Sequence, residues 1–144
     1  MKNEIEAVKE EYYKIAQKIN APKKYILFAD EPQDFGYPHV EYIDGMYYYV
    51  VTEKGRELER KSTVDSKDLL YWLISKLTSS MAADYELSHR DKDNDFRRLF
   101  FTKHVELLNE IDKLWANKER ERYNKILIQH PFSDNKLPKE INKT

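Results

Sequence analysis

The sequence predicts an α+β fold in which a small antiparallel β-meander packs against several α-helices. Three stretches support this prediction. Apolar side chains recur with the period of a helix over residues 3–20, follow the period of strands over 25–62, and return to the helical period over 65–129. With 144 residues, 40% of them hydrophobic, the chain is long enough to build one core. We therefore expect a single folded domain over residues 1–132, followed by a polar C-terminal tail over 133–144.

The composition excludes several classes of protein. Twenty-five basic and 26 acidic residues give a net charge of −1, which disfavours nucleic-acid binding through a basic surface. The chain has no cysteine, which excludes disulfides and thiolate nucleophiles and fits a reducing cytosol. Its longest apolar run, residues 46–51, is far shorter than the roughly 20 residues that span a bilayer. Since we also find no signal peptide, we expect a cytoplasmic protein without a membrane partner.

The first expected element is an amphipathic helix over residues 3–20, which Pro22 ends. Five apolar side chains lie on one stripe of this helix because they recur at steps of 3, 4, 3 and 4 residues. They are Ile5, Val8, Tyr12, Ile15 and Ile19. The stripe lasts fewer than three heptads, so we expect it to pack on the core of this protein and not in a coiled coil.

The segment with the period of strands begins with a short apolar run, residues 25–29, and continues through a loop over 30–37. Three strands are expected after this loop, at residues 39–43, 46–53 and 56–61. The first two are separated by Asp44-Gly45, a pair favoured in two-residue type I′ hairpins. Lys54-Gly55 separates the second strand from the third, which completes a three-stranded meander.

Two-residue turns would determine which strand residues oppose each other and therefore share a face. The expected pairs are Tyr42 with Tyr47, Val40 with Tyr49, and Val51 with Leu58. We expect this apolar side of the sheet to face the core. The opposite side mixes acids with aromatic and aliphatic residues and is expected to be half solvated. Its members are Glu41, Ile43, Met46, Tyr48, Val50, Glu57 and Glu59.

Three helices are expected after the strands. The first is long, with Asp65 as its N-cap, and extends to about residue 89. It is apolar over a wide arc, so we expect Trp72 on this helix to be a core residue. The second extends from residue 95 or 102 to Trp115, and the third covers residues 119–129.

Few residues point to chemistry. No two of the four histidines have the i, i+4 spacing of zinc ligands on a helix, and three glycines cannot supply a phosphate-binding loop. We therefore expect no metal and no cofactor. Glu57 and Glu59 would lie about 7 Å apart on one strand face. Paired carboxylates at such distances serve as acid and base in glycosidases, although a solvated acidic strand is the better explanation.

Charge is unevenly distributed along the chain. Residues 30–44 contain five acids and no lysine or arginine, a local charge of −5. An acidic patch beside tyrosines speeds the capture of a basic protein partner, but it can also be an ordinary solvated surface. Arg97-Arg98 can bind an acidic partner instead, or pair with neighbouring acids within the fold.

Short motifs recur along the sequence in a characteristic order and spacing. They are Asp34-Phe35-Gly36, Glu41-Tyr42, Tyr49-Val50-Val51, Glu53-Lys54-Gly55, Glu57, Glu59-Arg60, Leu69-Leu70-Tyr71-Trp72, Met81-Ala82, Tyr85-Glu86-Leu87, Arg90, Arg97-Arg98 and His130-Pro131-Phe132. In their order and spacing these motifs resemble the immunity protein 63 family of bacterial polymorphic-toxin systems. The similarity covers roughly residues 20–134, and Lys54 stands where arginine is common in the family.

The resemblance implies a non-enzymatic α+β protein that binds a cognate toxin domain and blocks it by stoichiometric protein–protein interaction. It implies no catalytic residue and no cofactor, and it leaves open a monomer or a homodimer. Two alternatives remain: a small hydrolase that uses Glu57 and Glu59, and a general protein-interaction module.

The expected toxin contact is the half-solvated side of the meander together with the preceding acidic loop. Its residues are Asp30, Asp34, Glu41, Tyr48, Glu57 and Glu59. A competing surface, suited to an acidic partner, consists of Arg90, Arg97 and Arg98. The first surface requires a basic partner, and the second requires an acidic partner.

Overall fold

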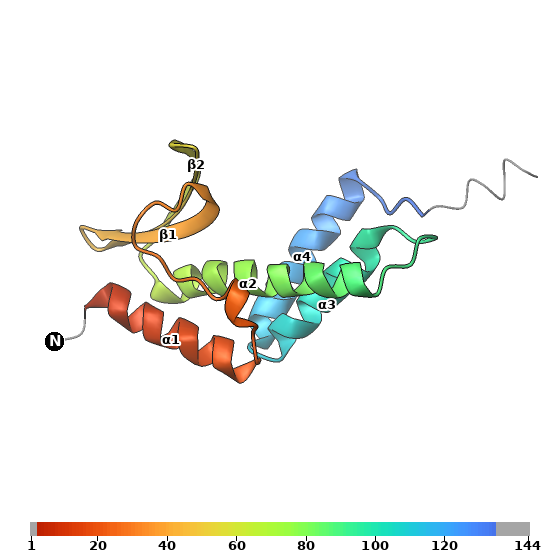
Figure 1. Ribbon diagram of the computed structural model, residues 1–144, viewed down its shortest axis with the longest axis horizontal. Helices are drawn as coiled ribbons and strands as arrows, with labels where there is room; N and C mark the ends of the chain where they lie inside the picture. Colours follow the sequence, from red (N-terminus) through yellow and green to blue (C-terminus); the bar gives the residue numbers. More distant parts are fainter. Residues whose placement is uncertain (1–2, 135–144) are drawn as a thin grey trace, which may run out of the picture. The chain divides into compact units, whose positions relative to one another are not determined.

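The computed structural model describes residues 3–134 and confirms the α+β class, with one three-stranded antiparallel sheet and four α-helices (Figure 1). The elements are α1 (Glu4–Lys18), the 3₁₀ turn η1 (Lys23–Tyr25), β1 (Phe35–Ile43), β2 (Met46–Glu53), β3 (Arg56–Thr63), α2 (Ser66–Ser88), α3 (Phe96–Asn109) and α4 (Lys113–Gln129). Within the described residues, none of the helices combines the length and the apolar character needed to cross a membrane.

The described residues form two compact units that divide between Leu77 and Thr78, and α2 contributes its first half to one unit and its second half to the other. The extent of a single domain over residues 1–132 stays a prediction. Of the expected polar tail, residues 135–144 lie outside the described part of the chain.

The sheet of the first unit is the predicted meander, with strand order β1-β2-β3. Both turns have two residues, because Ile43 pairs with Met46 and Glu53 pairs with Arg56. In the first turn, Asp44 and Gly45 have φ angles of 50° and 81°. Two positive φ angles are the requirement of a type I′ turn, and the second turn meets it too. The turn prediction is confirmed.

The register between β2 and β3 differs from the prediction at one point. Val51 pairs with Glu59 and not with Leu58, because a β-bulge shifts the register between Val51 and Thr52. Leu58 is the extra residue, and it is 57% exposed. Since side chains alternate between the two faces of a strand, one extra residue moves Glu59 to the face of Val51. The placement of Glu57 and Glu59 on one face is therefore wrong.

β1 begins at Phe35, four residues earlier than predicted, and residues 25–29 form no strand. The extension contains a bulge between Phe35 and Pro38, where Gly36 has a φ of 87°. Glycine tolerates this conformation, so the loop signal of Gly36 was compatible with a bulged strand. The apolar run 25–29 instead begins at the last residue of η1 and continues to Ala29, whose carbonyl accepts from the Val40 N–H of β1 at 2.9 Å.

The core of the first unit combines α1, one face of the sheet and the first half of α2. Of the predicted α1 stripe, Val8, Tyr12 and Ile19 are buried. The sheet contributes Val40, Tyr47 and Tyr49, and α2 contributes Leu69, Leu70, Tyr71, Leu73, Ile74 and Leu77. Val40, Tyr47 and Tyr49 of the predicted apolar side thus face the core, as expected, whereas Tyr42 is 40% exposed.

Trp72 is only half buried, so its assignment to the core is wrong. Its ring meets Tyr49 edge to face at 6.1 Å between centroids. The other contact is polar: Nζ of Lys61, on the edge strand β3, lies 4.7 Å from the indole ring. A lysine ammonium group thus lies against this tryptophan, where apolar neighbours were expected.

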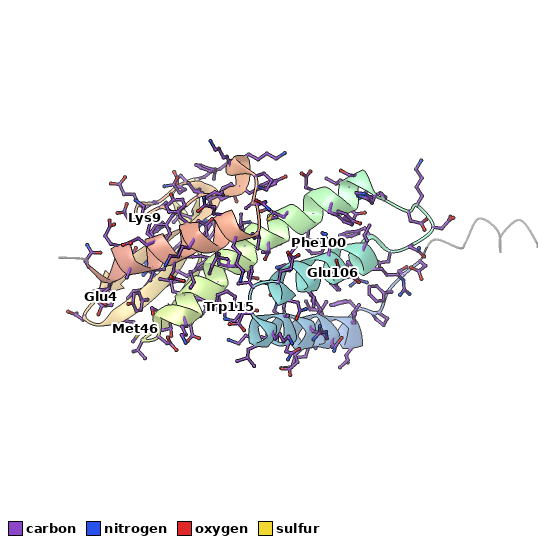
Figure 2. All side chains as sticks on the ribbon, turned by 90° about the horizontal axis from the view of Figure 1, so that it is seen from below. Glu4, Lys9, Met46, Phe100, Glu106 and Trp115 are labelled. Atoms are coloured by element: carbon purple, nitrogen blue, oxygen red, sulfur yellow. The ribbon has the colours of Figure 1, made fainter. Side chains whose placement is uncertain are left out.

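The second unit contains the remainder of α2 with α3 and α4, whose side chains are drawn in Figure 2. Trp115 belongs to α4 and not to the preceding helix, because Asp112 accepts from the N–H of Leu114 at 2.8 Å and caps α4. The interior includes a polar chain: His104 bonds through Nδ1 to the Tyr123 hydroxyl and through Nε2 to Thr78 Oγ1. All three side chains are buried.

Candidate functional site

The face of the sheet that points away from Tyr47 and Tyr49 is called the outer face below. It carries His39, Glu41, Ile43, Met46, Tyr48, Val50, Glu57 and Arg60. It is mixed in burial, as predicted: Val50 is fully buried, whereas Ile43 and Glu57 are exposed. Glu41, Tyr48 and Glu57, three of the predicted contact residues, come together here.

Arg60 is the centre of the outer face. Its Nε and Nη2 donate to the two carboxylate oxygens of Glu57 at 2.8 and 2.9 Å, and its Nη1 donates to Glu41 Oε1 at 3.0 Å. The guanidinium carbon lies 5.3 Å from the centre of the Tyr48 ring. Sequence reasoning missed Arg60, because the bulge at Leu58 changes the face that Arg60 occupies. Arg60 thus connects Glu41 on β1 with Glu57 on β3 and contacts the Tyr48 ring, and these side chains form one charged cluster.

His39 completes the cluster from β1. It is 2% exposed, and its Nε2–H donates to Glu41 Oε2 at 2.8 Å. The other ring nitrogen, Nδ1, is buried and has no hydrogen-bond partner among the described residues. A buried polar atom without a partner costs about 1–3 kcal/mol, so this position is unfavourable for folding. The spacing of the histidines in the sequence gave no indication of the buried position of His39.

The cluster is charged at neutral pH. The Arg60 guanidinium first, and then the His39 ring, hold the pKa of the Glu41 carboxyl below its usual range. Arg60 likewise lowers the pKa of Glu57, and the two carboxylates raise the pKa of Arg60. Two carboxylates and one guanidinium leave a surplus of one negative charge.

The acidic loop, residues 30–34, is attached to the sheet through Asp34. Its carboxylate accepts from the Gly55 N–H at 2.7 Å, and its carbonyl accepts from the Lys54 N–H at 3.1 Å. The Asp34 N–H donates to Thr52 Oγ1 at 3.3 Å. Asp34 therefore holds the loop at the β2–β3 turn while it stays exposed, and Asp30 is also exposed.

Glu59 lies apart from the outer face. It pairs with Val51, its carboxylate is 3.7 Å from Lys61 Nζ, and its charge adds to burial in raising the pKa of Tyr49. Glu57 and Glu59 thus face opposite sides of the sheet. The acid–base pair that a small hydrolase would need is not assembled there.

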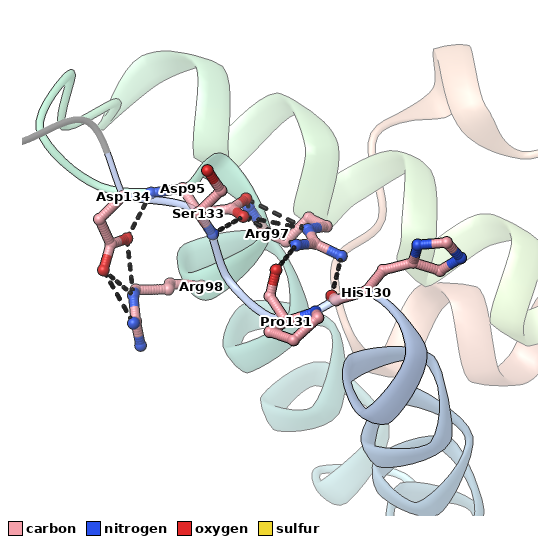
Figure 3. A network of polar contacts seen from close by, with 7 residues as sticks. All are labelled: Asp95, Arg97, Arg98, His130, Pro131, Ser133 and Asp134. Carbon is pink, nitrogen blue, oxygen red and sulfur yellow. Dashed lines mark hydrogen bonds and ion pairs between the residues drawn. The ribbon is translucent and has the colours of Figure 1, made fainter. Parts of the chain in front are cut away.

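The three arginines of the competing surface form ion pairs within the second unit, and Figure 3 shows those of Arg97 and Arg98. Arg90 binds Glu86 with two hydrogen bonds of 2.8 and 2.7 Å. Arg97 pairs with Asp95 at 2.8 Å, and Arg98 pairs with Asp134 at 2.9 Å. Pairing with acids inside the fold was the alternative that the sequence left open for Arg97-Arg98.

Arg97 also binds the segment that follows α4. It donates to the carbonyls of His130 and Pro131 at 3.0 and 2.9 Å, while Asp95 accepts from the Ser133 N–H at 2.8 Å (Figure 3). Arg97 above all, with the N–H groups of Ser133 and Arg97, holds the pKa of Asp95 far below its usual range. We call this arrangement of Asp95, Arg97 and residues 130–134 the C-terminal clamp.

A groove of about 370 Å³ lies between α3 and α4. Its apolar lining is formed by Phe101, Val105, Tyr123, Leu127 and Phe132. Phe132 belongs to the clamp, and the guanidinium groups of Arg97 and Arg98 lie 5.6 and 4.2 Å from its ring centre. Within the described part of the chain, no three side chains of the kinds that bind metals are grouped as ligands.

Comparison with known proteins gives one match. The family model of immunity protein 63 matches residues 44–125, which is more than half of the chain. The matched range includes Tyr48, Glu57 and Arg60 of the outer face, whereas His39 and Glu41 precede it. No curated protein and no solved structure matches the chain.

Proposed function

Because this chain belongs to the immunity protein 63 family, we propose that it binds a cognate toxin domain in the cytoplasm and neutralises it by stoichiometric association, without catalysis. The family match over residues 44–125 is the observation that carries the proposal. The protein would act as a monomer or a homodimer. The hydrolase alternative loses its basis, since Glu57 and Glu59 lie on opposite faces of the sheet.

The proposed contact is the outer face together with the acidic loop. Compared with the prediction from sequence, Glu59 leaves this surface and Arg60 joins it. The surface combines a tyrosine and an arginine, the residue types that dominate binding energy at protein interfaces, with fixed carboxylates around them. Ile43, 51% exposed at the end of the β1–β2 hairpin, adds apolar area beside them.

The function is tested with the gene found upstream of this one, if it encodes a large secreted protein with a variable C-terminal domain. That domain is expressed alone and together with this chain. We expect the chain to restore growth and to co-purify with the domain in a fixed ratio. Failure to form a complex, or protection by a small fraction of one equivalent of this chain, would contradict stoichiometric binding.

The contact surface is tested by reversing single charges. Glu57→Lys is expected to slow association with the toxin domain about tenfold at low salt, because it removes an acid that steers a basic surface. Glu59→Lys is the matched control: the same change, two residues away, on the other face of the sheet. Association rates are measured by surface plasmon resonance, and thermal denaturation checks that both variants fold.

Equal effects of the two variants would show that the outer face has no special role. If Glu57→Lys binds like the parent and Arg98→Glu does not, the arginine surface is the contact. In that case the toxin domain must present acids and not bases.

A further inference from the structure

We infer that Glu41 is the anchor of the toxin contact: its carboxylate, oriented by His39 and Arg60, accepts a lysine or arginine side chain of the partner. The inference rests on the proposed function and deepens it, since it names the chemistry of the group that the surface receives. His39 and Arg60 act as positioning residues, because they hold Glu41 and are not themselves the anchor.

Glu41 is fixed before any partner arrives. One carboxylate oxygen accepts from Arg60 on β3 at 3.0 Å, and the other accepts from His39 on β1 at 2.8 Å. Each oxygen of an ionised carboxylate can accept a second hydrogen bond. The Glu41 side chain is 27% exposed, so its remaining acceptor capacity is accessible from solvent. An acid that is already ordered loses less conformational entropy on binding, which favours a strong contact.

His39 supplies an independent observation. It is directed into the cluster through Nε2, while its buried Nδ1 has no partner among the described residues. A buried polar atom left unsatisfied needs an explanation, and departures from good local packing are concentrated at functional sites. Among residues 3–134, the one hydrogen bond that this ring makes orients Glu41. The hydrogen bond by which His39 orients the Glu41 carboxylate therefore explains the buried position of His39.

The charge around Glu41 selects a cation. Glu41, Glu57 and Arg60 together carry one surplus negative charge, and the chain has no lysine or arginine from residue 30 to residue 44. An acidic partner group would meet repulsion from both carboxylates and from the acidic loop. A lysine or arginine of the partner is attracted by these carboxylates, and the adjacent ring of Tyr48 adds a favourable cation–π contact.

The test measures dissociation of the toxin domain from four variants. Glu41→Gln keeps the shape of the side chain but removes its charge, and is expected to weaken affinity about 10- to 100-fold, mainly through faster dissociation. Glu59→Gln, the matched control, is expected to stay within about twofold. His39→Leu is expected to weaken binding about tenfold, and His39→Gln, which keeps a donor for Glu41, to restore most of it.

Two further measurements distinguish a role of His39 in positioning Glu41 from a role of His39 in stabilising the fold. His39→Leu removes the unsatisfied Nδ1, so its stability in urea should equal or exceed that of the parent while binding falls. In the Glu41→Gln background, His39→Leu should cause no additional loss of affinity, because its effect passes through Glu41.

The inference is overturned if Glu41→Gln binds like Glu59→Gln, or if His39→Leu weakens binding equally in both backgrounds. Both results leave the proposed function standing, provided that the parent chain binds the toxin domain. If the parent chain does not bind that domain, the proposed function fails and the inference fails with it.

Discussion

Replacing Asp95 with alanine is expected to destabilise the fold by about 3 kcal/mol, since it breaks the C-terminal clamp. Asp95 caps α3 by accepting from the Arg97 N–H at 3.0 Å, and its carboxylate is the acid partner of the Arg97 guanidinium. The side chains of Asp95 and Arg97 are 8% and 20% exposed. The variant therefore loses a helix cap and leaves a mostly buried guanidinium without its counter-ion. Urea denaturation measures the change.

A neighbouring ion pair provides the control. Arg98, whose side chain is 47% exposed, pairs with Asp134 at the end of the clamp, so Arg98→Ala should destabilise the fold much less than Asp95→Ala. Equal losses for the two variants would show that burial is not the reason for the stability of the clamp.

The pH dependence of the same variant gives a second measurement. The pKa of Asp95 is lowered in the folded state, so this group stabilises the fold above its ordinary pKa of about 3.9. That stabilisation is lost as the pH falls through the folded-state pKa. The difference in stability between the parent and Asp95→Ala should therefore be full at pH 7 and smaller at pH 3. A constant difference would contradict the charged pairing of Asp95 with Arg97.

Ile74→Ala is expected to destabilise the protein by about 2–5 kcal/mol, the second large effect. Ile74 is 0% exposed in the first half of α2, and its truncation removes apolar contacts and leaves a cavity. Leu87→Ala on the same helix is the control, because Leu87 is 63% exposed and should cost less than about 0.5 kcal/mol. Trp72→Ala should fall between them, since Trp72 is half buried.

Thermal or urea unfolding of these three variants tests the assignment of the core. A larger loss for Trp72→Ala than for Ile74→Ala would mean that the indole supports the core more than its exposure indicates. The expectation from sequence, which placed Trp72 among the core residues, would then be correct in energy although not in burial.

The elements that depend on local patterns could be predicted from the order of the residues. The α1 stripe was visible because 3.6 residues complete one helical turn, and Val8, Tyr12 and Ile19 are buried at that spacing. The β1–β2 turn was visible in Asp44-Gly45, because few residue pairs tolerate two positive φ angles. Most of the outer face followed from that turn. Membership of the immunity protein 63 family was also visible in short motifs, and the family match confirms it.

The details that depend on contacts between distant residues became visible only in the folded chain. The bulge at Leu58 has no residue signature of its own, yet it separates Glu57 from Glu59 and brings Arg60 to the outer face. The burial of His39 and its bond to Glu41 follow from the pairing of β1 with β2.

The hydrogen-bond partners of the arginines also depend on contacts between segments that are distant in sequence. Arg97 and Asp95 are two residues apart, but the carbonyls of His130 and Pro131 that complete the clamp come from the far end of the second unit. A local pattern specifies backbone conformation and the face on which a side chain lies. Which charges meet is decided by the energy of packing segments that are distant in sequence, and a single sequence does not record that energy position by position.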